Sequence, residues 1–208
     1  MLRQPRGLAG RKKLQAIIDA ARRIVLAEGL DQAKMGAIAT AAGVSTATLY
    51  AYFPSKNDLF RAIVEKVAQG IDTRLDTALH TPDGDPIQTL ATALMAPLTD
   101  PDLRAVFRIL AVEGPRFPDV LATFDAHTRL KAHQAAVALF ERLATEGKFA
   151  AGAAETAARQ LLGMLEHETL VLAIMRGDDA PAPPDPVGIV REAVMTLKAR
   201  FGRDGLAL

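Results

Sequence analysis

The chain has 208 residues, half of them hydrophobic, with 25 Lys or Arg, 24 Asp or Glu and no cysteine. This length and apolar content suffice for one large domain or two small ones with a buried core. The absence of cysteine excludes disulfide bonds, thiolate metal sites and a cysteine nucleophile. No segment approaches the roughly 18 apolar residues of a membrane span, and no apolar segment typical of a secretory signal follows the basic N-terminus MLRQPRGLAGRKK. We therefore expect a soluble, cytoplasmic protein.

The charge is distributed unevenly along the chain. Residues 1–60 contain nine Lys or Arg and four Asp or Glu, a net charge of +5. The remainder contains 16 basic and 20 acidic residues, a net charge of −4. A basic first quarter joined to an acidic remainder indicates that the first quarter binds a polyanion. Taken alone, the charge fits a chance fluctuation of a charged surface equally well.

The hydrophobic residues are mostly Ala and Leu, and β-branched runs are scarce, which favours helices throughout. The apolar periodicity predicts an all-α chain of about nine helices. We place them at about 11–28, 35–42, 45–53, 55–78, 86–96, 100–112, 119–146, 153–176 and 186–201. We expect two parts, residues 1–54 and residues 55–208, with 55–78 as the connecting helix.

Helix starts are marked by capping residues. Asp85, Asp100 and Asp185 each precede a proline, so each offers an N-cap carboxylate followed by proline at the first helical position. Ser55 and Asp58 have the spacing of a capping box, with Asp in place of the usual Glu or Gln.

The two short helices around Gly43 have the spacing of a helix-turn-helix unit. Ala39 is small where the helices must approach closely, and Gly43 suits a tight turn with a left-handed backbone. Leu49 closes the small core from the second helix, together with Ile38 and Phe53. The spacing alone matches many helical hairpins, but the Ser45 cap and the short second helix add to it.

Burial of Leu49 and Phe53 turns Thr46, Ala47, Tyr50 and Thr48 outward. Thr46 and Ala47 lie at the N-terminal end of the helix, the part of a recognition helix that reaches base edges. The hydroxyls of Tyr50 and Tyr52 and the ammonium of Lys56 can donate to phosphate oxygens. The alternative is that both tyrosines are half-buried side chains with solvated hydroxyls.

The N-terminus forms a basic arm that could follow the DNA backbone or minor groove, or be a solvated tail. Its basic residues are Arg3, Arg6, Arg11, Lys12 and Lys13.

The stretch IATAAGVSTATLYAYFPSKNDLF resembles the N-terminal domain of the TetR family of transcriptional regulators. The resemblance implies that residues 45–52 form the recognition helix, with Thr46, Ala47 and Tyr50 at the bases. It places Thr48, Tyr52 and Lys56 at the backbone, and Ser45 is also among the expected DNA-binding residues. Two positions depart from the family pattern: Ala47 stands where Gly is frequent, and Lys34 stands where a capping Thr is frequent. Lys34 can still reach a phosphate, but it cannot cap the helix.

The segment RILAVEGPRFPDVLATF resembles the C-terminal domains of an AefR-like subgroup of the same family. The helix at about 153–176 has too many apolar residues for one buried face, so we expect burial on two sides. With the helix at about 186–201 it would form a homodimer interface, as is usual in the family. A symmetric dimer binds an inverted-repeat operator in double-stranded DNA. The alternative is a central helix of a monomeric bundle.

Apolar residues in the second part could line a cavity for a small-molecule effector, although each is individually more often a core residue. The apolar candidates are Phe107, Phe117, Phe124, Phe140, Met95 and Met164. Polar candidates near them are Arg108, Glu113, Arg116, His127, His133 and His167. The histidine spacing does not favour a metal site, and we expect no cofactor.

These patterns favour a transcriptional repressor that a small, largely apolar ligand releases from its operator. A helical enzyme or carrier that uses the same cavity is an alternative, but no Gly-rich phosphate loop, HExxH or GxSxG motif is present. A regulator that activates transcription, or that responds to a protein partner, also remains open.

Overall fold

The computed structural model describes residues 7–79, 84–172, 175 and 185–203. Over these ranges the chain is helical and forms no strand; an isolated antiparallel bridge pairs Phe149 with Gly202. No helix in the described ranges is long and apolar enough to cross a membrane. The prediction of an all-α fold is confirmed.

The chain divides into two compact units, which we call unit 1 and unit 2. Unit 1 comprises Met1–Val67 and Arg108–Phe124, and unit 2 comprises Ala68–Phe107 and Asp125–Leu208. This division follows the density of backbone contacts. The functional boundary after residue 54 stays a prediction.

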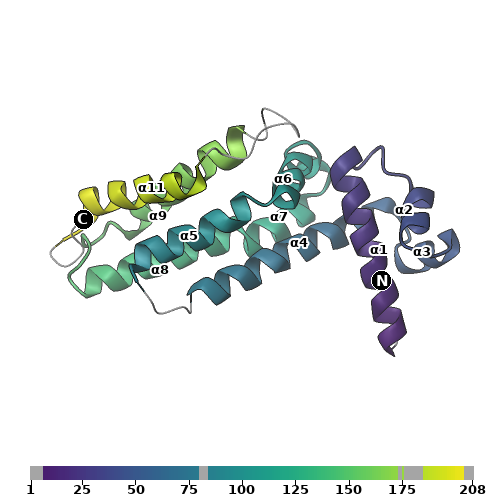
Figure 1. The fold of residues 1–208 in the computed structure, drawn as a ribbon, viewed down its shortest axis with the longest axis horizontal. Coiled ribbons are helices and arrows are strands. Elements are labelled where there is room, and N and C mark those ends of the chain that lie inside the picture. The colour runs from purple at the N-terminus through teal and green to yellow at the C-terminus, as the bar shows by residue number, and fades with distance from the viewer. Residues whose placement is uncertain (1–6, 80–83, 173–174, 176–184, 204–208) are drawn as a thin grey trace. The chain divides into compact units, whose positions relative to one another are not determined.

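Unit 1 is built around the first helices of the chain (Figure 1). It contains α1 (Gly7–Glu28), α2 (Met35–Ala41), α3 (Thr46–Tyr52), the start of α4 (Lys56–Leu79), the end of α6 (Pro101–Glu113), the 3-10 turn η1 (Gly114–Arg116) and most of α7 (Pro118–His127). Helix α1 packs against α2, and α2 packs against α3. Because α1 begins at Gly7, Arg11, Lys12 and Lys13 are exposed helical residues. Arg3 and Arg6 lie outside the described residues.

The core of unit 1 consists of aliphatic and phenylalanine side chains spaced at helical intervals. Ile17 and Val25 on α1 and Phe60 and Ile63 on α4 have almost no exposed surface. The start of α4 is fixed as predicted, because Ser55 and Asp58 cap each other. The Ser55 amide and hydroxyl donate to Asp58 Oδ2 at 3.2 and 2.7 Å, and the Asp58 amide donates to Ser55 Oγ at 3.1 Å.

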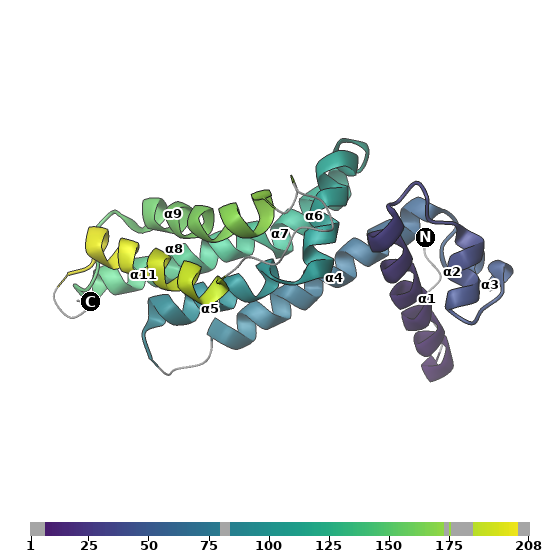
Figure 2. The ribbon, with the colours of Figure 1, turned by 45° about the horizontal axis from the view of Figure 1, so that its top comes forward.

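In unit 2, four helices lie side by side in both views (Figures 1 and 2). They are α5 (Pro86–Leu98), α8 (Arg129–Thr145), α9 (Ala154–Glu166) and α11 (Pro186–Phe201). A π-helical turn, η2 (His167–Val171), continues α9. The rings of Phe140 and Phe149 stack with centroids 4.8 Å apart, and Phe201 lies 5.6 Å from Phe149.

The three predicted aspartate caps are confirmed. The carboxylate of Asp85 accepts from the Ile87 amide at 3.0 Å, and that of Asp100 accepts from the Asp102 amide at 2.9 Å. Asp185 accepts from the amide of Gly188 at 2.8 Å. Each carboxylate satisfies an amide that has no partner within its helix.

Two helices differ from the sequence prediction. The single helix predicted at about 119–146 is broken at Thr128, whose φ of −120° and ψ of −93° are not helical. β-branched Thr has weak helix propensity, and Thr128 begins the next helix by accepting from the Ala132 amide at 2.9 Å. The helix predicted to reach about residue 176 becomes η2 after Glu166. Residues 176–184 lie outside the described residues, so its end is not described.

Candidate nucleic-acid interface

The helix-turn-helix unit has the small buried core that its sequence predicts. Leu49 of α3 and Ile38 of α2 have no exposed surface, and Ala39 and Phe53 are 1% and 2% exposed. The methyl side chain of Ala39 allows α2 and α3 to approach closely. A larger side chain there would have no free space to occupy.

Gly43 makes the turn between α2 and α3. Its φ is +66°, a left-handed conformation that residues with a side chain rarely adopt. The turn is closed by two backbone hydrogen bonds, from Gly43 N to Thr40 O at 3.1 Å and from Val44 N to Ala39 O at 3.0 Å. The glycine therefore fixes the angle at which α3 leaves α2.

Ser45 caps the N-terminus of α3. Its hydroxyl oxygen accepts from the Thr48 amide at 3.1 Å and lies 2.9 Å from the Thr48 hydroxyl. Thr48 is half-buried. Both predicted contact residues thus also hold the first turn of the helix together.

The residues predicted to read bases are exposed on α3. Thr46 and Ala47 lie in the first turn, and the side chain of Tyr50 is 49% exposed although Leu49 beside it is fully buried. Thr46 and Tyr50 are four residues apart and so share one face of the helix. Small residues at the start and a phenol one turn later leave a surface that a DNA groove can accommodate.

The residues predicted at the phosphate backbone have partners in this structure. The Tyr52 hydroxyl donates to Gly10 O on α1 at 3.4 Å, and the Lys56 ammonium donates to Asp31 O at 2.8 Å. An ammonium has three donors, so Lys56 can bind a phosphate without giving up Asp31. Lys34 is exposed and makes no side-chain cap on α2, as predicted.

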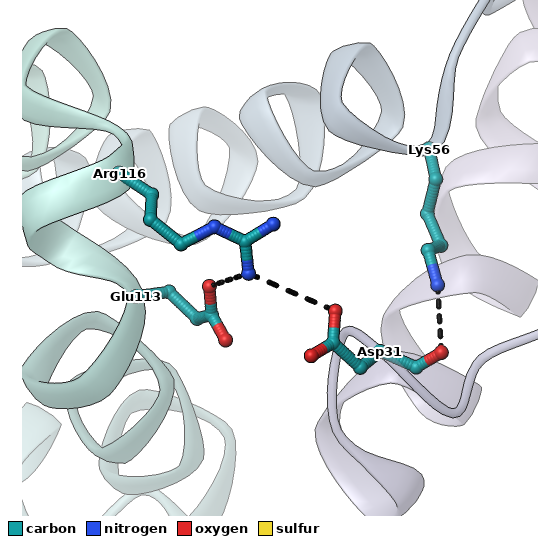
Figure 3. Close-up of polar contacts among 4 residues, drawn as sticks. All are labelled: Asp31, Lys56, Glu113 and Arg116. Atoms are coloured by element: carbon teal, nitrogen blue, oxygen red, sulfur yellow. Dashed lines mark hydrogen bonds and ion pairs between the residues drawn. The ribbon is translucent and has the colours of Figure 1, made fainter.

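Two of the residues considered near the effector site, Glu113 and Arg116, instead pair with each other, and Arg116 reaches Asp31 in the loop after α1 (Figure 3). Arg116 Nη1 lies 2.6 Å from Glu113 Oε2 and 3.8 Å from Asp31 Oδ1. The Phe117 ring packs against Phe60, with centroids 5.4 Å apart. Sequence reasoning missed these contacts, because their partners are distant in the chain.

The other predicted effector residues are not all together. Phe107 lines a cavity in unit 2, whereas Met164 and His167 line an open depression between α9 and α11. Phe124 is buried, and Arg108 and His127 are half-buried. Within unit 2, Phe107 therefore lines a different pocket from Met164 and His167.

The cavity in unit 2 has a volume of about 40 Å³. Its walls are mostly apolar and come from α4, α5, α6, α8 and α9, with Leu94, Leu103 and Leu162 among them. Thr128, Arg129 and Glu166 form its polar part. Sequence reasoning did not select these three, since no motif distinguishes them from surface residues.

A capped short helix that follows a left-handed glycine turn, with a buried inner face and an exposed outer face, defines a helix-turn-helix DNA-binding protein. Comparison with known proteins gives the family. Residues 17–63 match the family of bacterial regulatory proteins named tetR. Residues 86–203, more than half of the chain, match the AefR-like transcriptional repressor C-terminal domain. The chain belongs to the TetR family of transcriptional regulators, which are not enzymes.

Solved structures share the fold. A TetR-family transcriptional regulator from Mesorhizobium loti MAFF303099 has 23% identity and a TM-score of 0.77, over 95% of this chain and 100% of the other. The flavonoid-responsive regulator FrrA has 25% identity and a TM-score of 0.67, over 94% and 100%. A transcriptional regulator from Saccharomonospora viridis, solved with choline, has 16% identity and a TM-score of 0.74, over 94% and 100%. Among the curated proteins, none matches the chain.

Proposed function

We propose that this protein is a sequence-specific repressor that binds an inverted-repeat operator through α3 and acts in the cytoplasm. Helix α3 supports this proposal because one side of it is buried and the other is exposed. Leu49 is fully buried, while Thr46, Ala47 and Tyr50 on the outer side are exposed. The tyrosine hydroxyl and nearby Lys34 and Lys56 supply donors for phosphates on either side.

Exposed apolar residues on the last helices support a homodimer. Val171 and Met175 are 43% and 78% exposed, and Val187 and Met195 on α11 are 72% and 43% exposed. Leu161, Leu165 and Leu170, on α9 and η2, are buried, so the opposite side of this helix packs into the core of unit 2. These helices already bury one apolar face in the core, and the exposed second apolar face favours association with another copy of the chain. Met164 and His167 would then lie at this interface rather than in the effector site.

The effector would bind in the cavity of unit 2. Flavonoid-responsive FrrA and the choline-bound regulator share the fold of this chain, which supports a small organic effector for this protein. A volume of about 40 Å³ is far below that of ordinary ligand sites, so an effector must open the cavity. The ligand then prefers the opened conformation, and about 1.4 kcal/mol of preference weakens operator binding tenfold if that conformation fits DNA poorly. Movement of α4, which contributes Ile71 to the cavity, would reposition α3.

Selection from random duplex DNA tests the proposal. We expect enrichment of an inverted repeat, with affinity that falls steeply as salt rises. The two half-sites should be about one helical turn, or a multiple of it, apart. Absence of any enriched sequence from a folded, dimeric protein would contradict the assignment of α3 as a recognition helix.

A further inference from the structure

The polar part of the unit 2 cavity carries a carboxylate for which the described part of the chain supplies no hydrogen-bond donor. Glu166 lines the cavity at the end of α9 and is half-buried. Among the described residues nothing donates a hydrogen bond to its side chain or pairs with it within 4 Å. Burial raises the pKa of Glu166; Arg129 lowers this pKa and Asp125 raises it. A half-buried carboxylate without a donor is costly, and a ligand that supplies the donor removes that cost.

The cation beside Glu166 is already engaged. Arg129 Nε and Nη2 donate to the two carboxylate oxygens of Asp125 at 2.8 and 2.9 Å, a bidentate pair. With Glu166 and Asp125 ionised, the three side chains carry a net charge of −1. A ligand carboxylate would lie near the carboxylates of both Glu166 and Asp125, and one guanidinium does not balance three negative charges. This site therefore disfavours anions.

Helix α5 contributes another part of the cavity wall. Pro97 is inside α5, and both Pro97 and Ala93 line the cavity. Proline has no N–H, so the Ala93 carbonyl does not receive the hydrogen bond that residue 97 would otherwise donate. The same missing bond weakens the end of α5, which is the wall that can move when the cavity opens.

We propose that the effector of this protein is a cationic amine with a short apolar chain, whose ammonium group pairs with Glu166 while its chain fills the apolar part of the cavity. This inference rests on the proposed function, since it names the chemical class that acts at the same site. The side chain of Arg129 is 58% exposed, so the polar part of the cavity reaches solvent. The ammonium group would remain at this end as the chain enters between the leucines.

Three probes of equal length test the charge preference: hexylamine, hexan-1-ol and hexanoate, each titrated calorimetrically into the purified full chain. We expect hexylamine to bind tighter than hexanol by about tenfold or more, because a charge-assisted hydrogen bond replaces a neutral one. Hexanoate should bind most weakly. Equal affinities, preference for hexanoate, or no binding of any probe would each overturn the inference.

Substitutions test whether Glu166 causes the preference for hexylamine. Glu166→Gln should reduce hexylamine affinity to the level of hexanol, whereas Glu166→Asp should keep part of the preference. Glu141→Gln makes the same change of charge at an exposed position of α8 outside the cavity lining, and it should leave hexylamine binding unchanged. If Glu166→Gln binds hexylamine as tightly as Glu141→Gln does, with both folded by circular dichroism, the inference is wrong.

Operator selection on the same preparation separates the two proposals. A protein that selects an inverted repeat but shows no preference for the amine overturns the effector class alone. A protein that prefers the amine but selects no DNA supports the cavity assignment and overturns the repressor.

Discussion

The ring of Phe117, at the turn between α6 and α7, packs against the ring of Phe60 on α4, with centroids 5.4 Å apart and an interplanar angle of 57°. Phe60 is fully buried and Phe117 is 3% exposed. The guanidinium groups of Arg61 and Arg116 each lie 5.8 Å from the Phe117 ring centroid. A residue expected to touch the effector therefore anchors the turn within unit 1.

This packing predicts a large loss of stability when the ring is removed. Phe117→Ala should lower the free energy of unfolding by about 3–5 kcal/mol, the usual cost of deleting a buried phenylalanine. Leu121→Ala on α7, the next helix, should change it by less than about 1 kcal/mol, because Leu121 is 42% exposed. Urea denaturation of both variants measures the difference. Equal effects would show that the Phe60 contact contributes little.

The exposed tyrosine of α3 predicts a change in DNA binding without a change in stability. Tyr50→Ala should weaken binding to the selected operator by about 1–3 kcal/mol, or about fivefold to 150-fold. The unfolding midpoint should barely move, because half of the side chain is exposed. Tyr50→Phe separates the ring from the hydroxyl. Fluorescence anisotropy with a labelled operator gives both affinities, and an unchanged affinity for Tyr50→Ala would remove this residue from the interface.

Replacing each of two glycines in the helix-turn-helix by alanine should change the free energy of unfolding in opposite directions. Gly43→Ala should lower the free energy of unfolding by about 1–2 kcal/mol, since its φ of +66° opposes a side chain. This holds even though no atom beyond its chain neighbours lies within 4 Å of the added carbon. Gly36→Ala, in α2 with equal free space and no positive φ, should be neutral or stabilise by up to about 1 kcal/mol. Urea denaturation distinguishes them. If both variants shift in the same direction, backbone conformation is not what requires Gly43.

Features that arise from neighbouring residues were predictable from the sequence. Gly43, the Ser45 cap and the aspartate caps act through chemistry within a few positions, so their roles follow from spacing. The break at Thr128 was not predictable, because neither Gly nor Pro marks it and the apolar pattern continues on both sides.

The partners of the candidate site residues depend on the fold. Lys56 and Tyr52 bond to backbone oxygens 25 and 42 positions away in the chain. Periodicity also gave Phe107 and Phe117 the same apolar character, although one lines the cavity and the other packs against Phe60. Only the packing of distant segments distinguishes a cavity wall from a core. The cavity residue Glu166 was missed for the same reason, since its environment comes from α7 and α8.

The raised pKa of Glu166 predicts how stability depends on pH. Burial raises the pKa of this carboxyl in the folded protein above its ordinary value of 4.5. Between 4.5 and the folded value the folded state binds more protons than the unfolded state, so stability falls as pH rises through this window. Glu166→Gln removes that loss and should raise the Tm at pH 7.

The advantage of Glu166→Gln should shrink as pH falls toward 4.5, because protonation of the wild-type carboxyl in the folded state removes the cost of burying its charge. Thermal unfolding from pH 4.5 to pH 8 follows the difference. Glu141→Gln serves as the control, because it makes the same substitution at an exposed side chain. A difference that grows at low pH would contradict the predicted direction.

The exposed apolar residues of the last helices predict where the dimer can be broken. Met195→Glu would bury a charge without a partner if α11 lies at the interface, at a cost of several kcal/mol per symmetric pair. We expect this variant to sediment as a folded monomer at concentrations where the wild type is dimeric. Leu130→Glu is the matched control, because Leu130 on α8 is also 43% exposed but lies outside the proposed interface. A dimer that survives Met195→Glu and dissociates with Leu130→Glu would place the interface on α8 instead of α11.

The monomeric Met195→Glu variant should also lose most of its affinity for the inverted repeat. It should keep weak binding to a half-site, because only paired recognition helices contact both halves.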